Sequence, residues 1–276
     1  MKRTPLARIE LVVIAAIVIL LPAAITASLG TARNLAKIAL CANNLRQIGV
    51  AVYEYAQISD GDLPNVAYPL YFDPVRSDET HPYMAYRSDF RVTQESKQLM
   101  PYRLACLYEA GLIEDASVFY CPAQTYPSLM FKSYIKPYPP NTSTEWGTLP
   151  QQYNEDTGGN QWVRCGYEWF PIDKNPILYR VSINHLPRAP IGLCRRFDNL
   201  DPNLPYCFDY LRLADRFSHS YDQVIGVNVL YSDGRVSFGD DPNIFTHRVW
   251  DMDPSNRSRP EIMAIYYQRI LLLAGQ

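Results

Sequence analysis

Residues 9–29 read IELVVIAAIVILLPAAITASL, an apolar run in which Glu10 is the only charged residue. Its length is close to the roughly 20 apolar residues that an α-helix needs to cross a bilayer core. Lys2, Arg3 and Arg8 precede the run, so the positive-inside rule keeps the amino terminus in the cytoplasm and places the rest of the chain across the membrane. The sequence predicts a single-pass protein of the cytoplasmic membrane with its head in the periplasm or outside the cell.

The composition predicts that the rest of the chain is globular. Of its 276 residues, 47% are apolar and 20% are charged, which excludes a largely disordered chain. The formal net charge is −2, with 26 basic and 28 acidic residues and no long basic run. Because no basic surface is indicated for a phosphate backbone, nucleic acid is not an expected partner.

The apolar residues that follow the anchor recur at spacings of four and three. They are Cys41, Leu45, Ile48, Val52 and Tyr55. This spacing predicts a helix with one apolar stripe that another part of the chain must cover. The turn-forming sequence SDGDLP at 59–64 ends it, so we predict a helix from about Leu6 to Gln57, roughly 78 Å long. This continuation favours an anchor over the alternative, a signal peptide cut near Ala27 that releases the head.

The start of the chain resembles a known family. Residues 8–17, RIELVVIAAI, are similar to the signature of type IV prepilins and type II secretion pseudopilins, in which four residues and then Glu follow a cleavage point. Aligned on Glu10, the resemblance implies a prepilin peptidase that cuts between Pro5 and Leu6 and N-methylation of the new terminus. The family has Gly before the cut and usually Phe after it, and proline removes a backbone donor there. This departure favours a minor, capping or unprocessed subunit.

Glu10 is costly to bury in lipid unless a partner neutralises it. One interpretation leaves its carboxylate in the headgroup layer. The other, which the resemblance implies, pairs it with the free amino terminus of a neighbouring subunit, so that it sets the register of an assembly of helices.

Further segments resemble a subgroup of prepilin-like proteins that is named after an H-X9-DG element. They are CANNLRQIG at 41–49, LACLYEAGLI at 104–113, VFYCP at 118–122 and HSYDQVIGVNVLYSDGRV at 219–236. The motif positions of the last segment are His219, Gly226, Asn228, Asp233 and Gly234. Thirteen residues separate His219 from Asp233 instead of nine, because the loop at 220–223 is enlarged.

Local patterns predict the elements of the head. Residues 104–113 indicate a short helix stopped by Gly111, and residues 118–121 a strand closed by proline. Alternation over 227–238 predicts a hairpin near the middle of a sheet, with a two-residue turn at Asp233 and Gly234.

Two longer segments complete the head. Proline-rich residues 124–160 indicate a long loop or variable insertion. Residues 259–274 predict an amphipathic helix that packs within the chain. The expected fold is therefore α+β and pilin-like, with a leader and anchor at 1–30, an extramembrane helix at 31–58 and a head at 59–276 built on a mainly antiparallel sheet.

The sequence offers little sign of metal or catalytic chemistry. The four histidines, at 81, 185, 219 and 247, have no metal-ligand spacing, so no metal site is predicted. Oxygen ligands for calcium are conceivable at Asp240, Asp241 and Asn243, and at Asp251, Asp253 and Asn256. Since these lack EF-hand spacing, solvated turns are the favoured interpretation and no cofactor is expected.

His219 is predicted to be a hydrogen-bonding strut between its loop and the Asp-Gly hairpin. If it serves a reaction instead, Asp233 is the expected partner, and an exported hydrolase would need both in one cleft with a nucleophile. No Gly-x-Ser-x-Gly elbow accompanies them. We therefore predict that the chain is not an enzyme.

Six cysteines in an exported chain suggest disulfides. Two pairs are considered, Cys106 with Cys121 and Cys194 with Cys207. Cys41 lies on the packing face of the helix and is predicted to be a free buried thiol. Cys165 is left unassigned.

The predicted function is assembly. The helices of several pilin-like subunits, or of several copies of this chain, would bundle in a type IV pilus or type II secretion-like filament. The first alternative is a membrane-tethered module that never polymerises and binds glycan or peptide through its tyrosine-rich loops. The second is the exported hydrolase.

Overall fold

The computed structural model describes residues 6–64, 82–88, 99–134, 146, 162–179, 189–190, 193–212, 216–221, 224–254 and 259–275. The side chains of residues 6–9, 19–28, 87–88, 99–100, 162, 179, 189, 224 and 259 lie outside this description. So do several residues singled out above, namely Pro5, His81, His185, Asn256 and most of the segment 124–160.

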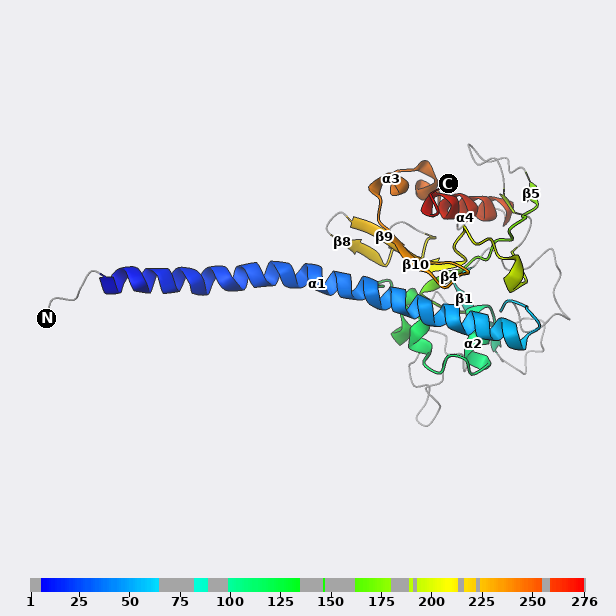
Figure 1. The fold of residues 1–276 in the computed structure, drawn as a ribbon, viewed down its shortest axis with the longest axis horizontal. Helices are drawn as coiled ribbons and strands as arrows, with labels where there is room; N and C mark the ends of the chain where they lie inside the picture. Colours follow the sequence, from blue (N-terminus) through cyan, green and yellow to red (C-terminus); the bar gives the residue numbers. More distant parts are fainter. Residues whose placement is uncertain are drawn as a thin grey trace.

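Helix α1 (Leu6–Ile58) is continuous over 53 residues, which confirms the predicted long helix. At 1.5 Å per residue it is roughly 80 Å long. It ends where Asp60 and Gly61 take φ angles of 51° and 84°, and the amide of Gly61 donates to the carbonyl oxygen of Ala56 at 2.8 Å. Figure 1 shows its amino-terminal half projecting away from the head and its carboxyl-terminal half lying against it.

The carboxyl-terminal half of α1 is buried along the predicted stripe. Cys41, Leu45, Ile48 and Val52 are all 0% exposed, and Tyr55 is half-buried. Since these positions recur every three or four residues, the buried surface follows one side of the helix. The prediction that the head covers this stripe is confirmed.

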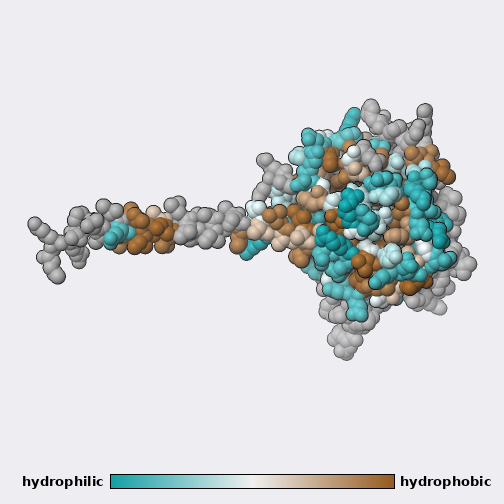
Figure 2. Space-filling view, viewed as in Figure 1, coloured by the Kyte–Doolittle hydropathy of each residue, from teal (hydrophilic) through white to brown (hydrophobic). Residues whose placement is uncertain are grey.

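The projecting half of α1 carries apolar side chains that nothing in the described chain covers. Residues 10–18 are all exposed, with Leu11 at 71% and Ile14 at 62%. Figure 2 shows this apolar surface on the projecting helix. Among the described residues, no helical segment combines the length and the apolar character needed to cross a bilayer.

The head is built on a five-stranded antiparallel sheet. Its strands are β4 (Tyr167–Trp169), β7 (Cys207–Asp209), β8 (His219–Tyr221), β9 (Val224–Leu230) and β10 (Val236–Gly239). Strand β9 is central, because it pairs with β10, β7 and β8. The fold class predicted from the sequence, α+β with an antiparallel sheet, is confirmed.

The hairpin between β9 and β10 has a different turn from the one predicted. Val236 pairs with Leu230, and the amide of Tyr231 donates to the carbonyl oxygen of Arg235 at 2.9 Å. Three residues therefore form the loop, with positive φ (81°) at Gly234 alone. A type I turn followed by a left-handed residue fits this loop length, so the prediction of a two-residue turn was wrong.

The two faces of the sheet pack against different helices. Alternate residues of the strands divide between two cores: Tyr167, Cys207 and Leu230 join the core that contains α1, whereas Phe208 and Val229 join the core that contains α4 (Arg259–Leu273). This follows from the two-residue period of a strand. The head thus has three layers, α1, sheet and α4, as Figure 1 shows, and the predicted internal packing of the carboxyl-terminal helix is confirmed.

Smaller elements surround these layers. A three-stranded sheet, a two-stranded sheet, two short α-helices and several 3-10 turns are described. They are β1 (Met84–Ser88), β2 (Leu99–Pro101) and β3 (Trp162–Arg164); β5 (Leu178–Tyr179) and β6 (Ala189–Pro190); α2 (Leu104–Glu109) and α3 (Pro242–Phe245); and the turns η1 (Ala116–Phe119), η2 (Pro127–Leu129), η3 (Phe131–Ser133), η5 (Phe197–Asn199) and η7 (Arg248–Asp251).

The strand predicted at 118–121 is not formed: residues 118 and 119 end η1, and residues 120 and 121 follow it outside any strand. The Asp115 carboxylate accepts the amide of Ser117 at 2.8 Å and caps the turn, which favours a helical start over an extended one. Phe119 then stacks on Trp146, with ring centroids 4.9 Å apart. Trp146 is the one described residue of the segment 135–161, and it lies in the core rather than on a solvated loop.

A buried carboxyl group lies between the sheet and α4. Glu168 of β4 is 0% exposed; its Oε2 accepts the amide of Leu211 at 3.0 Å and its Oε1 accepts the hydroxyl of Tyr266 at 2.9 Å. Burial raises the pKa of Glu168 to about 7, although these hydrogen bonds and the guanidinium groups of Arg212 and Arg269 favour the carboxylate. The native state therefore holds this proton more tightly than the unfolded chain does.

This raised pKa predicts a pH-dependent stability. Between pH 4.5 and about 7 the native state keeps a proton on Glu168 that the unfolded chain releases, so the free energy of unfolding should fall as the pH rises through this window. Denaturant unfolding of the native chain and of Glu168→Gln over a pH series measures the difference. The assignment is contradicted if the difference in free energy of unfolding between the native chain and Glu168→Gln is the same at every pH. It is also contradicted if the native chain becomes more stable relative to the variant as the pH rises.

Candidate functional site

A disulfide between Cys41 and Cys121 joins helix α1 to the head. The predicted bond between Cys106 and Cys121 was therefore wrong, and so was the free thiol predicted at Cys41. The reason is three-dimensional: the stripe of α1 packs on η1, and the chain leaves η1 directly into Cys121. The side-chain Nδ2 of Asn44 also donates to the carbonyl oxygen of Tyr120 at 3.2 Å, which fixes this register.

The other four cysteines are free and buried. The predicted bond between Cys194 and Cys207 is thus also wrong. Burial raises the pKa of Cys106 and of Cys165 to about 12, so these thiols stay protonated near neutral pH. The Cys165 thiol donates to the carbonyl oxygens of Tyr83 and Tyr167.

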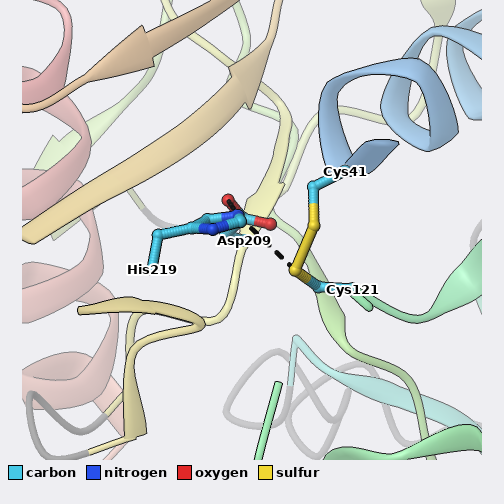
Figure 3. Close-up of side chains that lie close together, drawn as sticks. All are labelled: Cys41, Cys121, Asp209 and His219. Carbon is cyan, nitrogen blue, oxygen red and sulfur yellow. Dashed lines mark hydrogen bonds and ion pairs between the residues drawn. A yellow bond between two sulfur atoms is a disulfide. The ribbon is translucent and has the colours of Figure 1, made fainter. Parts of the chain in front are cut away.

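His219 lies against the disulfide and a buried carboxylate. Its Nε2 is 3.5 Å from Sγ of Cys121, 3.3 Å from Oδ2 of Asp209 and 3.1 Å from Nδ2 of Asn228. Figure 3 shows the side chains of Cys41, Cys121, Asp209 and His219 pointing toward one another. We call Cys41, Cys121, Asp209, His219 and Asn228 the junction cluster, because it lies where α1 meets the sheet.

The register of the sheet assembles this cluster. Strand β7 pairs with Val229 and Leu230, and β8 pairs with residues 224–226, so Asn228 lies between the two pairings. Asp209 ends β7 and His219 begins β8. The amide and the side chain of Asn228 both donate to Oδ2 of Asp209, at 2.7 and 2.9 Å. The polar atoms are thus buried where strand pairing is interrupted.

The position of Asp233 differs from the prediction. It lies in the exposed hairpin turn, where its carboxylate accepts the amide of Arg235 at 2.9 Å. The carboxylate partner of His219 is Asp209, so the prediction that Asp233 is its partner was wrong. The predicted strut between the loop and the hairpin turn is also not formed, because His219 contacts residues of the strands. The pair that the hydrolase alternative requires is not formed, and His219 is 1% exposed.

Gly226 has a steric role next to the cluster. A Cβ built on it would lie 2.0 Å from Cζ of Phe238, whose ring meets the ring of His219 edge-on at 5.7 Å. A residue with a Cβ at this position would require the ring of Phe238 to move. The motif positions Gly226, Asn228 and His219 are therefore brought together, whereas Asp233 and Gly234 form the turn.

The residues considered for calcium include a helix cap. The Asp241 carboxylate accepts the amide of Asn243 at 2.9 Å and caps α3. Among the described residues, the group of His, Cys, Asp and Glu side chains able to surround one metal ion consists of Cys41, Cys121, Asp209 and His219 instead. Sequence spacing missed this set because its members come from four separate segments. An Asp in a strand flanked by Phe208 and Tyr210 was the available signal for a buried carboxylate.

Glu10 lies away from the cluster, on the projecting half of α1. It is exposed, as are the apolar side chains of residues 11–18 that follow it. No described residue from elsewhere in the chain lies near enough to bury this surface. Leu6, the residue after the predicted cleavage point, is the first residue of α1.

Comparisons of the chain with family models, with curated proteins and with solved structures each find no match.

The Cys41–Cys121 bond should contribute a large part of the stability of the head. It joins residues 80 apart, and closing a loop of that length in the unfolded chain corresponds to about 4.5 kcal/mol. We expect the Cys41→Ser/Cys121→Ser variant to unfold at lower denaturant concentration and to be insensitive to reductant. Cys106→Ser is the control, and it should keep the reductant sensitivity of the native chain. Equal stability of the double variant and the native chain would contradict the prediction.

Replacing Gly226 by Ala should destabilise the head by about 1–3 kcal/mol, because the ring of Phe238 must move out of its packing. The cost should be smaller in a Phe238→Leu background, where the ring tip is absent. Gly239→Ala is the control, because its Cβ would meet its nearest neighbour at an ordinary 3.5 Å. Denaturant unfolding of this double-mutant cycle is the measurement, and equal costs in both backgrounds would exclude the steric explanation.

Proposed function

We propose that this chain is a pilin-like subunit, anchored in the cytoplasmic membrane, that assembles through the projecting half of α1 with other copies or with related subunits. The observation that carries this proposal is the division of α1 into two halves. One half is buried under the head and bonded to it through Cys41, whereas the other half exposes residues 10–18.

The exposed apolar side chains on the projecting half of α1 favour burial in lipid or among other helices. A contiguous apolar surface of this kind marks an interaction site, because leaving it in water is unfavourable. Residues 9–29 supply an apolar run of membrane-spanning length, and the basic residues before it favour a cytoplasmic amino terminus. In this arrangement the head lies in the periplasm or outside the cell.

Glu10 supplies the specificity of the proposed assembly. A carboxylate among apolar side chains is stabilised by a positive charge in the same environment. The amino terminus of a neighbouring helix provides that charge when two helices are staggered along their axes. Pro5 before the helix favours a minor or unprocessed subunit over one that is cut in large numbers.

Cysteine cross-linking in intact membranes tests this proposal. With a short bismaleimide, Ile14→Cys should give a self-adduct or an adduct with another pilin-like subunit, because residue 14 lies on the projecting surface. The native chain controls for its own cysteines, whose described free thiols are buried. Asp233→Cys, on the exposed hairpin turn of the head, is the matched control and should give several-fold less adduct.

A second substitution tests Glu10 separately. Glu10→Gln should lower the Ile14→Cys adduct several-fold and leave the membrane-bound fraction unchanged. A membrane-bound chain without any adduct would favour the tethered binding module. A chain released from the membrane by alkaline extraction would contradict the anchor.

A further inference from the structure

Three buried atoms of the junction cluster have no hydrogen-bond partner among the described residues. They are Oδ1 of Asp209, Nδ1 of His219 and Oδ1 of Asn228, and each of these residues is 1% exposed. The Asp209 carboxylate accepts both hydrogen bonds from Asn228 on Oδ2. Within the described part of the chain, its only ion-pair partner is His219. A carboxylate buried in this way is costly unless it is paired, so a cation bound next to it would be favoured.

The spacing of the neighbouring ligand atoms fits a tetrahedral ion. In a tetrahedral site, Zn²⁺ lies about 2.3 Å from sulfur and about 2.05 Å from nitrogen and oxygen ligands. A sulfur and a nitrogen ligand are then about 3.6 Å apart, and a nitrogen and an oxygen ligand about 3.4 Å apart. The observed separations are 3.5 Å from Sγ of Cys121 to Nε2 of His219 and 3.3 Å from that nitrogen to Oδ2 of Asp209. The fourth ligand atom, of Cys41, also lies within 4.8 Å of the others.

We propose that the reduced form of this chain binds one Zn²⁺-class ion through Cys41, Cys121, Asp209 and His219. The two sulfur atoms, no longer bonded to each other, would separate to about 3.8 Å, the distance between two thiolates of a tetrahedral site. The second hydrogen-bonding shell is in place, because Asn228 donates to the coordinating carboxylate. The ion would join α1 to the sheet at the position that the disulfide occupies in the oxidised chain.

The chemistry of binding is a proton exchange. Each cysteine thiol loses its proton as its sulfur binds the ion, the Asp209 carboxylate binds as an anion, and His219 binds through a neutral ring nitrogen. A phosphine or a dithiol first supplies the two electrons, with two protons from solvent, that convert the disulfide to two thiols. These two thiols and one Zn²⁺ then give two zinc thiolates and two protons. The disulfide excludes this state, because a sulfur in the Cys41–Cys121 bond is not a thiolate. Metal binding is therefore specific for the reduced chain.

Cobalt titration of the full-length chain in detergent provides the test. Co²⁺ replaces Zn²⁺ and gives thiolate-to-cobalt charge-transfer bands together with the visible bands of a tetrahedral ion. The chain reduced with a phosphine should bind one equivalent that Zn²⁺ displaces, whereas the oxidised chain should show neither band. Asp209→Asn and His219→Ala should weaken binding by about tenfold or more, and Cys41→Ser/Cys121→Ser should remove the charge-transfer band of the site.

Two controls make the result decisive. Cys165→Ser removes a buried thiol outside the cluster and should leave the titration unchanged. Circular dichroism identifies the variants that keep the native fold. The proposal is overturned if the reduced, folded native chain shows no charge-transfer band, if the band persists in Cys41→Ser/Cys121→Ser, or if the oxidised chain gives the same spectrum. Cross-linking in membranes does not enter this test, so its outcome is independent of the proposed assembly.

Discussion

The packing of the α1 stripe under the sheet is the interaction on which the rest of the structure depends. Leu45, Ile48 and Val52 are withdrawn from water on one side of the helix, and burying side chains of this size contributes roughly 1.5–3 kcal/mol each. The same face of the sheet presents Leu230, whose side chain approaches within 3.1 Å of a Cβ built on Gly49. A larger residue at 49 would hold the helix away from the sheet. The separation of the two layers is thus set by a small residue facing a large one.

The parts of the fold that are visible in the sequence are those with a local period. The long helix, its buried stripe and the carboxyl-terminal helix all follow from residues three or four apart, and the hairpin follows from alternation. The length of the hairpin loop could not be predicted from the sequence, because Asp-Gly is compatible with loops of two and of three residues. The strand predicted before Cys121 was wrong because the cap at Asp115 favours a 3-10 turn, and this outweighs the β-propensity of Val118 and Phe119.

The junction cluster was hidden because it depends on tertiary contacts. Cys41, Cys121, Asp209 and His219 come from four segments that meet only when β7 and β8 align along β9. The motif resemblance indicated His219, Gly226 and Asn228, and these residues do lie together. It pointed to Asp233 as the carboxylate, whereas the register of β7 supplies Asp209. Spacing along the chain cannot distinguish these two carboxylates, since both are separated from His219 by intervening turns.

Helix α1 is attached to the head at both ends of its buried half. At the end of α1, the amide of Leu63 donates to the carbonyl oxygen of Arg195 at 2.8 Å, and the amide of Phe197 donates to that of Gly61 at 2.9 Å. At the other end of the buried half, Cys41 is the first 0%-exposed residue and carries the bond to Cys121. A pull on the projecting half reaches this covalent bond before it reaches the apolar contacts of Leu45 and Ile48. The disulfide, those contacts and the hydrogen bonds beyond them all join the same helix to the same head, so they hold it in parallel and the covalent bond shields the weaker contacts behind it.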